Sequence, residues 1–370
     1  MRHLGIQYLK EGMKVGKNIY KSDGNVLLGK GVELKREYIE KLPSQGITSI
    51  YVECDVCKDI DAGDILSEKM RIKCFSAIKN INDKILLGYN KFKNHDIKEK
   101  EFNSLLFYIH KDLHQLAIEL VEDFQNTKAP MFNLIDTRVN EDYIYAHMTN
   151  VAALSIYLGM ALGYDYEKLV ALVKGCLVHD IGIILSVPSE IRNKQEKLSN
   201  EEMQLIQKHP EIGYAILRKM EGINILSAHV AYQHHERYNG EGYPRKLAGK
   251  EVTEYGYIAG ISDVYDAITN NRVYKLRISP DKAREFLMVS RDIFFPAYLV
   301  DKFLEKIPPF PNALSVKLSN GFIGVVIGQN KENLSRPIIR IISDYNDNSV
   351  ETFDINLMKE LSVMIEKVLN

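Results

Sequence analysis

The chain has 370 residues, of which 45% are hydrophobic and 26% are charged. This composition is typical of soluble globular proteins, and the length allows two or three domains. Lysine and arginine number 48 and aspartate and glutamate 49, so the formal net charge is -1, which excludes bulk attraction to nucleic acid or to an anionic membrane surface. An anionic ligand must therefore be bound by local charges.

The first residues carry charges or glycines every few positions and lack the continuous apolar segment of a signal peptide. No apolar run approaches the ~20 residues of a membrane span. We therefore expect a cytoplasmic protein without a membrane-spanning helix. The four cysteines are too few for a disulfide framework. We interpret the C-x-x-C pair Cys54 and Cys57 as incidental thiols, with a redox pair or half of a zinc site as the alternative.

Residues 1–56 alternate short β-like runs with turn signals such as Asp23-Gly24, and residues 34–42 have a helical pattern. This segment predicts a small α/β module, and it contains no cluster of catalytic residue types. We expect a regulatory role for it.

Residues 57–137 form the next segment, in which apolar side chains recur three and four positions apart. A polar break at 90–96 separates two long helices. Such helices suit a connector that relays a signal, or a homodimer interface. Equally, they suit core helices of an all-α domain.

Residues 138–308 continue the helical period, with loops around Pro188, Pro210 and Pro244. The prolines of "KIPPFPNAL" end it, because proline removes a backbone donor and crowds the preceding turn. Residues 309–370 then predict a small β-rich tail, with a hairpin at Asn320-Gly321 and a short final helix. The fold class expected is thus mainly α, with small β-containing modules at both ends.

The histidines of the helical region are clustered with acidic residues. His179 directly precedes Asp180, His234 and His235 are adjacent, and Asp263 lies further along the chain. Imidazole nitrogen and carboxylate oxygen together suit Fe, Mn or Zn, and one carboxylate can bridge two ions. A two-metal site is a recurring arrangement for phosphodiester chemistry.

Four motifs together resemble the HD-GYP domain, a branch of the HD metal-dependent phosphohydrolases. They occur in the right order and spacing: "HDIG" at 179–182, "HP" at 209–210 with Gly213 after it, "HHERYNGEGYP" at 234–244 and "SDVYDAITNNRVYK" at 262–275. The resemblance covers residues 140–308. It implies an all-α bundle that hydrolyses cyclic di-GMP to linear pGpG, or on to GMP, by attack of a metal-bound hydroxide.

The resemblance also implies a set of site residues. Two divalent ions would be held, with iron as the first choice and manganese or zinc as alternatives. Asp180 would bridge them, and with Asp263 it is the candidate catalytic carboxylate. The metal ligands implied are His147, His179, Asp180, His209, His234, His235 and Asp263.

Two cations and a loop complete the expected site. Arg272 and Lys275 correspond to substrate-contact positions, three apart on one helix face, where they would meet the ligand's phosphates. The loop at Gly240, Gly242, Tyr243 and Pro244 suits either substrate access or a protein partner. Glu236 and Arg237 are candidates for fixing imidazole orientation, and Asp266 for orienting a ligand, moving a proton or a purely structural role.

Three positions depart from the usual pattern. Ile183 stands where the signature usually has a lysine, so a cation or proton source is missing. Tyr143 stands where members with a third metal have glutamate, which favours two metals and linear pGpG as product. Asn239 replaces a common aspartate, which we regard as mild because both residues favour turns.

The sequence leaves three functions open. The intact set of seven ligands favours a phosphodiesterase acting on cyclic di-GMP. Ile183 favours a degenerate sensor that binds a cyclic dinucleotide with little turnover. A hydrolase acting on another cyclic dinucleotide or phosphoester is the third.

Overall fold

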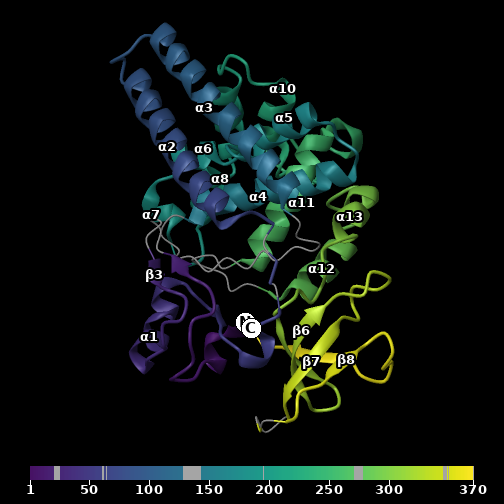
Figure 1. The fold of residues 1–370 in the computed structure, drawn as a ribbon. Coiled ribbons are helices and arrows are strands. Elements are labelled where there is room, and N and C mark those ends of the chain that lie inside the picture. Colours follow the sequence, from purple (N-terminus) through teal and green to yellow (C-terminus); the bar gives the residue numbers. More distant parts are fainter. Residues whose placement is uncertain are drawn as a thin grey trace.

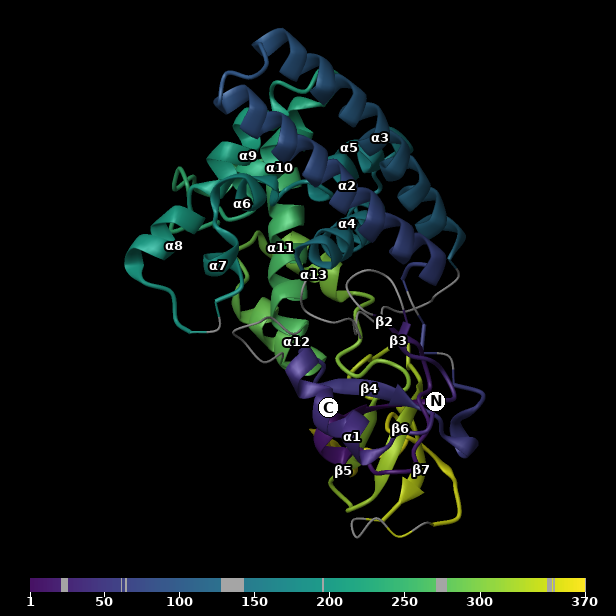
Figure 2. The same cartoon turned by 90° about the vertical axis from the view of Figure 1, so that its left-hand side faces the viewer.

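The computed structural model describes residues 1–20, 26–60, 62–63, 65–127, 143–194, 196–270, 278–344, 348 and 350–369. Within these ranges a large helical part lies above a smaller β-containing part, and the β-containing part holds both chain ends (Figures 1 and 2). The mainly α fold expected from the sequence is confirmed.

The helical part contains twelve of the described helices. Their order along the chain is α2 Glu68–Lys93, α3 Glu99–Asn126, α4 Tyr143–Ala161, α5 Tyr166–Cys176, α6 Ile181–Ser186, α7 Ser189–Arg192, α8 Asn200–Ile206, α9 His209–Leu217, α10 Ile225–Gln233, α11 Glu254–Thr269, α12 Pro280–Val289 and α13 Ala297–Leu304. One apolar cluster runs from Ile65 to Ile307 and includes side chains of each of these helices except α7 and α8.

Helix α4 lies at the centre of this part. Its side chains are buried continuously from Tyr145 to Gly159, and a helix that is apolar all round is stable only inside a core. Helices α2 and α3 instead bury one stripe each, with Ile78 and Leu113 fully buried. Both stripes belong to the same core as α4, which agrees with the core-helix alternative for the long helices.

The β-containing part is built from both ends of the chain. The N-terminal segment contributes β1 Arg2–Gly5, β2 Ile19–Tyr20, β3 Val26–Leu28, α1 Arg36–Lys41 and β4 Ser49–Val52, and the C-terminal segment contributes β5 Ser315–Leu318, β6 Ile323–Gly328, β7 Ile338–Ser343, β8 Asp354–Asn356 and β9 Ile365–Val368. The C-terminal strands form one antiparallel sheet in the order β8-β7-β6-β5-β9. The expected hairpin at Asn320-Gly321 joins β5 to β6.

The two terminal segments contact each other. The amide of His3 donates to the carbonyl of Ala313 at 2.7 Å, and the amide of Gly5 donates to that of Leu369 at 3.0 Å. Leu369 also packs in the N-terminal apolar cluster. No local pattern in the sequence predicts this contact, since its residues are more than 300 positions apart. The domain boundaries after 56, 137 and 308 stay a prediction.

Two smaller expectations are wrong. The final segment forms no helix among the described residues; it turns and returns as β9, whose amides and carbonyls pair with β5. Cys54 and Cys57 are joined as a disulfide, with their Cα atoms 5.1 Å apart, because the turn at Asp55–Cys57 folds the chain back between them.

One stretch of the described residues, Tyr166–Ser186, is long and apolar enough to cross a membrane by composition, with a window of mean hydropathy 1.9. That window is 78% buried inside the protein, and it forms α5, a turn and α6 of the common core. Such burial is typical of a segment in a protein core.

Candidate metal centre

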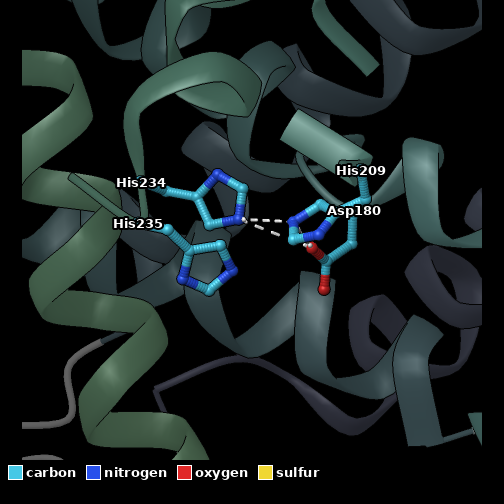
Figure 3. Close-up of side chains that lie close together, drawn as sticks. All are labelled: Asp180, His209, His234 and His235. Carbon is cyan, nitrogen blue, oxygen red and sulfur yellow. Dashed lines mark hydrogen bonds and ion pairs between the residues drawn. The ribbon is translucent and has the colours of Figure 1, made fainter. Parts of the chain in front are cut away.

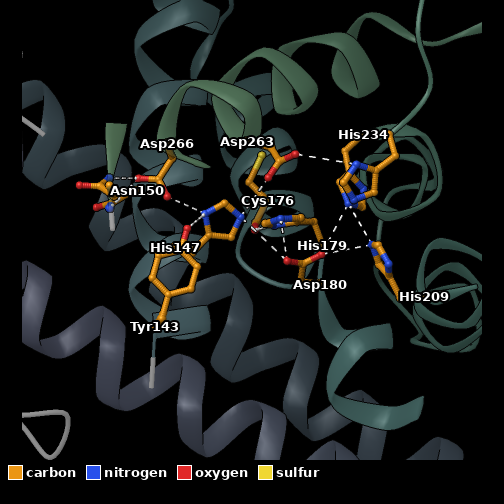
Figure 4. A network of polar contacts seen from close by, with 12 residues as sticks. Tyr143, His147, Asn150, Cys176, His179, Asp180, His209, His234, Asp263 and Asp266 are labelled. Carbon is orange, nitrogen blue, oxygen red and sulfur yellow. Dashed lines mark hydrogen bonds and ion pairs between the residues drawn. The ribbon is translucent and has the colours of Figure 1, made fainter. Parts of the chain in front are cut away.

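The seven ligands expected from the sequence converge in the middle of the helical part. They fall into two groups, and within each group the ligand atoms lie within 4.8 Å of one another. One group is Asp180, His209, His234 and His235, and the other is His147, His179 and Asp263. Figure 3 shows the first group and Figure 4 the wider polar network. All seven are buried except His235, whose side chain is 19% exposed.

Helix ends position most of these side chains. His179 and Asp180 occupy the turn between α5 and α6, His209 begins α9, and His234 and His235 follow the last residue of α10. Helix α6 approaches α9 closely because Gly182 has no side chain; a Cβ there would lie 2.0 Å from the carbonyl oxygen of His209. The glycine of the "HDIG" motif therefore brings the two halves of the first group together.

Backbone carbonyls fix three of the imidazole rings. The Nδ1 atom of His179 lies 2.8 Å from the carbonyl oxygen of Cys176. The Nδ1 atom of His209 lies 2.7 Å from the carbonyl oxygen of Ile206, and the Nδ1 atom of His234 lies 3.0 Å from the carbonyl oxygen of Val230. A carbonyl oxygen can only accept, so Nδ1 carries the proton in each ring. In the neutral ring Nε2 then presents its lone pair to the centre, as a metal ligand must.

His147 is held by a carboxylate instead. Its Nδ1 donates to Asp266 at 2.6 Å, and the other oxygen of Asp266 accepts from Asn150 at 2.8 Å and Asn270 at 2.6 Å. Asp266 is fully buried. Of the roles considered for it, the structure supports ligand orientation, since the carboxylate fixes the tautomer of His147 (Figure 4).

The converging atoms fit a bound cation. The Nε2 atoms of His209 and His234 face each other at 3.2 Å, although their Nδ1 protons leave both with lone pairs. His179 Nε2 and Asp180 Oδ1 are buried and make no hydrogen bond within the described residues. Buried acceptors facing acceptors are unfavourable unless a positive charge lies between them. This cluster of imidazole and carboxylate donors therefore indicates divalent metal binding.

The two oxygens of Asp180 face different groups. Oδ1 lies 3.3 Å from His209 Nε2 and 3.5 Å from His234 Nε2. Oδ2 lies 3.5 Å from His179 Nε2 and 3.9 Å from His147 Nε2. Asp263 also spans the groups, with Oδ1 3.1 Å from His147 Nε2 and Oδ2 3.9 Å from His235 Nδ1.

Burial and neighbouring charges shift the pKa values of three of these donors toward their metal-binding forms. Burial lowers the pKa of His179 to about 4, against the opposing charge of Asp180. Burial likewise holds the pKa of His235 well below its usual value. Burial alone would raise the pKa of the Asp180 carboxyl, but the adjacent histidines, His179 first, hold it well below the usual value. Neutral imidazoles around an ionised carboxylate are the forms that bind a cation.

The glycine-rich loop folds over one edge of the centre. Gly240 has a φ of +78°, and a Cβ on Gly242 would lie 2.4 Å from the amide nitrogen of Arg237. Tyr243, which precedes Pro244 in the loop, stacks on His235 with ring centroids 4.5 Å apart. The loop thus covers the more exposed ligand.

The expectation that Glu236 and Arg237 fix imidazole rings is wrong. Glu236 accepts from the amides of Arg245 and Leu247 at 2.9 and 3.0 Å, and Arg237 donates to the carbonyls of His234 and Glu236. The reason is geometric: the chain turns sharply after His235, so both side chains satisfy loop backbone groups instead.

The remaining expected residues are placed as follows. Arg272 and Lys275 lie outside the described residues. Tyr143 lies against the centre, with its hydroxyl 3.5 Å from His147 Nδ1 and the two rings stacked. Ile183 is half-buried on α6.

Two contributors were missed. Asn150 holds Asp266, and Arg71 of α2 donates to the Asn150 oxygen at 3.0 Å. A signal for Asn150 existed: an amide three positions after His147, on the same face of an otherwise apolar helix, requires a buried partner. No local signal marks Arg71, because its partner is 79 positions away.

Comparison with known proteins gives two family matches. Residues 124–292 match the model of the HD domain, and residues 315–370 match that of a KOW domain associated with the HD domain. The first match contains all seven converging residues. The second covers the C-terminal sheet.

Three curated relatives illustrate the similarity. The chain is 30% identical over 211 residues to the cyclic di-GMP phosphodiesterase PA4108 of Pseudomonas aeruginosa, covering 57% of this chain and 50% of that protein. It is 27% identical to a cyclic di-GMP phosphodiesterase of Thermotoga maritima, covering 74% and 75%. It is 30% identical to the 3'3'-cGAMP-specific phosphodiesterase 2 of Vibrio cholerae, covering 51% and 36%. The chain thus spans half or less of the first and third of these proteins.

Proposed function

Because this chain belongs to the HD domain superfamily, in its HD-GYP branch, we propose that it is a two-metal phosphodiesterase that hydrolyses cyclic di-GMP. The product we propose is linear pGpG, with GMP as the product of a second hydrolysis. The observation that carries the proposal is the position of Asp180, whose two oxygens face two separate groups of nitrogen ligands.

The two groups would each hold one divalent ion. His209, His234 and His235 would serve the first, and His147, His179 and Asp263 the second, with Asp180 between them. Ions held there would supply an activated water and neutralise the charge that develops on the phosphodiester. Iron is the first choice, and manganese or zinc suit the same mixed nitrogen and oxygen donors.

The protein's own groups orient this site. The carbonyls behind His179, His209 and His234 and the carboxylate behind His147 hold each ring in one tautomer. Tyr143 fills the place beside His147, so a third carboxylate ligand is missing there, and we propose two metals. Arg272 and Lys275 are proposed to bind the substrate phosphates.

The substrate class follows from the relatives. Two of those described are named for cyclic di-GMP and one for 3'3'-cGAMP, so a mixed cyclic dinucleotide is the alternative substrate. A cytoplasmic location, a protein partner at the Gly240–Pro244 loop and a homodimer through α2 and α3 complete the proposal.

Product analysis tests the function. Protein loaded with iron or manganese is incubated with cyclic di-GMP and, separately, with 3'3'-cGAMP, and the products are resolved by chromatography. We expect pGpG from cyclic di-GMP, and no product from the Asp180→Asn variant. Elemental analysis of chelator-free protein should give two metal equivalents; three would contradict the two-metal site.

One observation favours a second function, that of a sensor. Ile183 supplies no cation or proton beside Asp180, so a cyclic dinucleotide could be bound and not turned over. Saturable binding of cyclic di-GMP by the metal-loaded protein, with no linear product after hours, would favour the sensor over the enzyme.

A further inference from the structure

A cavity opens in the helical part, apart from the candidate metal centre. Its volume is about 1020 Å³, and helices α3, α5, α10 and α11 surround it; α5 and α10 lie close together in Figure 1. The side chains that line the cavity include three aromatic and three aliphatic ones: Tyr164, Tyr166, Tyr255, Ile118, Ile223 and Leu226. No residue of the metal centre lines it.

A buried cation lines this cavity. Lys174 is only 7% exposed, yet it forms no ion pair in the part of the chain that the structure describes. Its one hydrogen-bonding neighbour there is the ring of His110, whose Nε2 lies 3.5 Å from the ammonium nitrogen. Burial lowers the pKa of the Lys174 ammonium, with no carboxylate to oppose it. A buried ammonium is costly unless an anion or several acceptors compensate for it.

Three helices begin at the same cavity. The first turns of α5, α10 and α11 contribute Tyr166, Leu226 and Glu254 to its walls. Helix N-termini carry a partial positive charge that favours anions. The acidic side chains at the cavity do not neutralise Lys174: Glu254 accepts from the hydroxyls of Tyr164 and Tyr298, and Glu167 is exposed two helical turns away on α5.

We propose that this cavity is a second binding site, for an aromatic phosphate of the nucleoside monophosphate class, in which Lys174 contacts the phosphate. The tyrosines and aliphatic side chains form the flat, apolar wall that a base requires, and the buried ammonium with the three helix N-termini forms the positively charged pole that binds the phosphate. The volume lies at the upper end of that of small-molecule sites.

The same three helices lead to the candidate metal centre. His179 and Asp180 follow the end of α5, His234 and His235 follow the end of α10, and Asp263 lies on α11. The nine residues of α10 span about 13 Å. Occupancy of the cavity is therefore expected to change turnover at the centre, a consequence that rests on the proposed function.

Calorimetric titration of the metal-loaded full chain tests the binding site, with GMP, guanosine and inorganic phosphate as probes. The variants are Lys174→Met and, as a matched control, Lys111→Met, which removes an exposed lysine of α3. We expect one GMP-binding event to weaken at least tenfold in Lys174→Met and to persist in Lys111→Met. Guanosine and inorganic phosphate should each bind more weakly than GMP.

Two results would overturn the proposal: GMP binding that is the same in Lys174→Met as in the unaltered protein, or no GMP binding to the unaltered protein. Affinity for inorganic phosphate equal to that for GMP would overturn the assignment to an aromatic ligand. GMP bound as product at the metal centre would survive in Lys174→Met, so the two sites are distinguishable. Turnover of cyclic di-GMP, measured in parallel, separates failure of hydrolysis from failure of binding.

The melting temperature of Lys174→Met guards against misfolding. Methionine has nearly the length of lysine and no charge, so the substitution removes an uncompensated ammonium from the interior. We expect a melting temperature equal to or above that of the unaltered protein. Loss of GMP binding without loss of stability would indicate that Lys174 serves ligand binding and not the stability of the fold.

Discussion

At the scale of single residues, the candidate centre depends on which ring nitrogen carries the proton. Each of His147, His179, His209 and His234 has its Nδ1 proton bonded to a fixed acceptor. Three of these acceptors are backbone carbonyls, which no substitution of a side chain removes. The fourth is Asp266, so the orientation of His147 is the one that a single substitution can alter.

We expect Asp266→Asn to weaken metal binding in the group formed by His147, His179 and Asp263 by about 10- to 100-fold, because an amide orients the ring less strongly and adds no negative charge. Elemental analysis after dialysis should show one metal equivalent lost and one kept. Asp112→Asn, on the exposed face of α3, is the control and should keep both. Retention of two equivalents in Asp266→Asn would contradict the orienting role.

Ile183 occupies the position after "HDIG" at which a lysine is usual, so this site lacks that cation. Introducing the missing cation with Ile183→Lys should raise the turnover of cyclic di-GMP, because acid-base help is worth about 10²- to 10⁴-fold where it operates. Leu185→Lys, also half-buried on α6, is the matched control and should not raise it. Equal rates for Ile183→Lys and the unaltered protein would mean that α6 contributes no proton transfer.

At the scale of elements, the centre requires that α6 and α9 nearly touch. A Cβ at Gly182 would lie within 2.0 Å of the His209 oxygen and 2.9 Å of the Gly213 nitrogen. These are backbone atoms, which cannot move aside without shifting a helix. The glycine of "HDIG" therefore has a packing role as well as its place in a motif.

Gly182→Ala should destabilise the protein by about 1–3 kcal/mol or more, as overpacked sites do, and should lower metal content, because α9 carries His209. Chemical denaturation and elemental analysis measure the two effects. Gly29→Ala is the control: its Cβ would meet no atom closer than 3.8 Å, so its stability should change little. A Gly182→Ala protein with unaltered stability and metal content would contradict the close-packing argument.

At the scale of the whole molecule, ligands from five helical elements meet at one point, so metal binding and folding are coupled. Buried lone pairs that face one another, as at His209 and His234, destabilise the metal-free protein. A ligand that binds only the folded state adds RT ln(1 + [L]/Kd), or about 2.7 kcal/mol at 100 times Kd.

Removal of metal with a chelator should therefore lower the melting temperature, and re-addition of iron or manganese should restore it. In the Asp180→Asn variant the effect of re-addition should be much smaller, since both groups lose a shared ligand. Calorimetric melting curves measure this. A melting temperature that does not respond to metal in the unaltered protein would contradict the coupling.

The sequence by itself determined the mainly α fold, the β-rich tail and the seven side chains that converge. These features are carried by local periodicity, by proline and glycine positions and by motifs with fixed spacing, all of which are written within a few residues. The tight loop at Gly240 and Gly242 was also predictable, because glycine allows the backbone to turn sharply and to approach a site closely.

Only the tertiary structure decided the partners of these side chains. Asp266 orients His147 across 119 positions, Arg71 reaches Asn150 across 79, and the two chain ends share a core. The last segment became a strand because β5 offered unpaired backbone groups, and Lys174 became notable only through its burial. Such contacts join residues far apart in the chain, and no local pattern encodes which distant group a buried polar atom will meet.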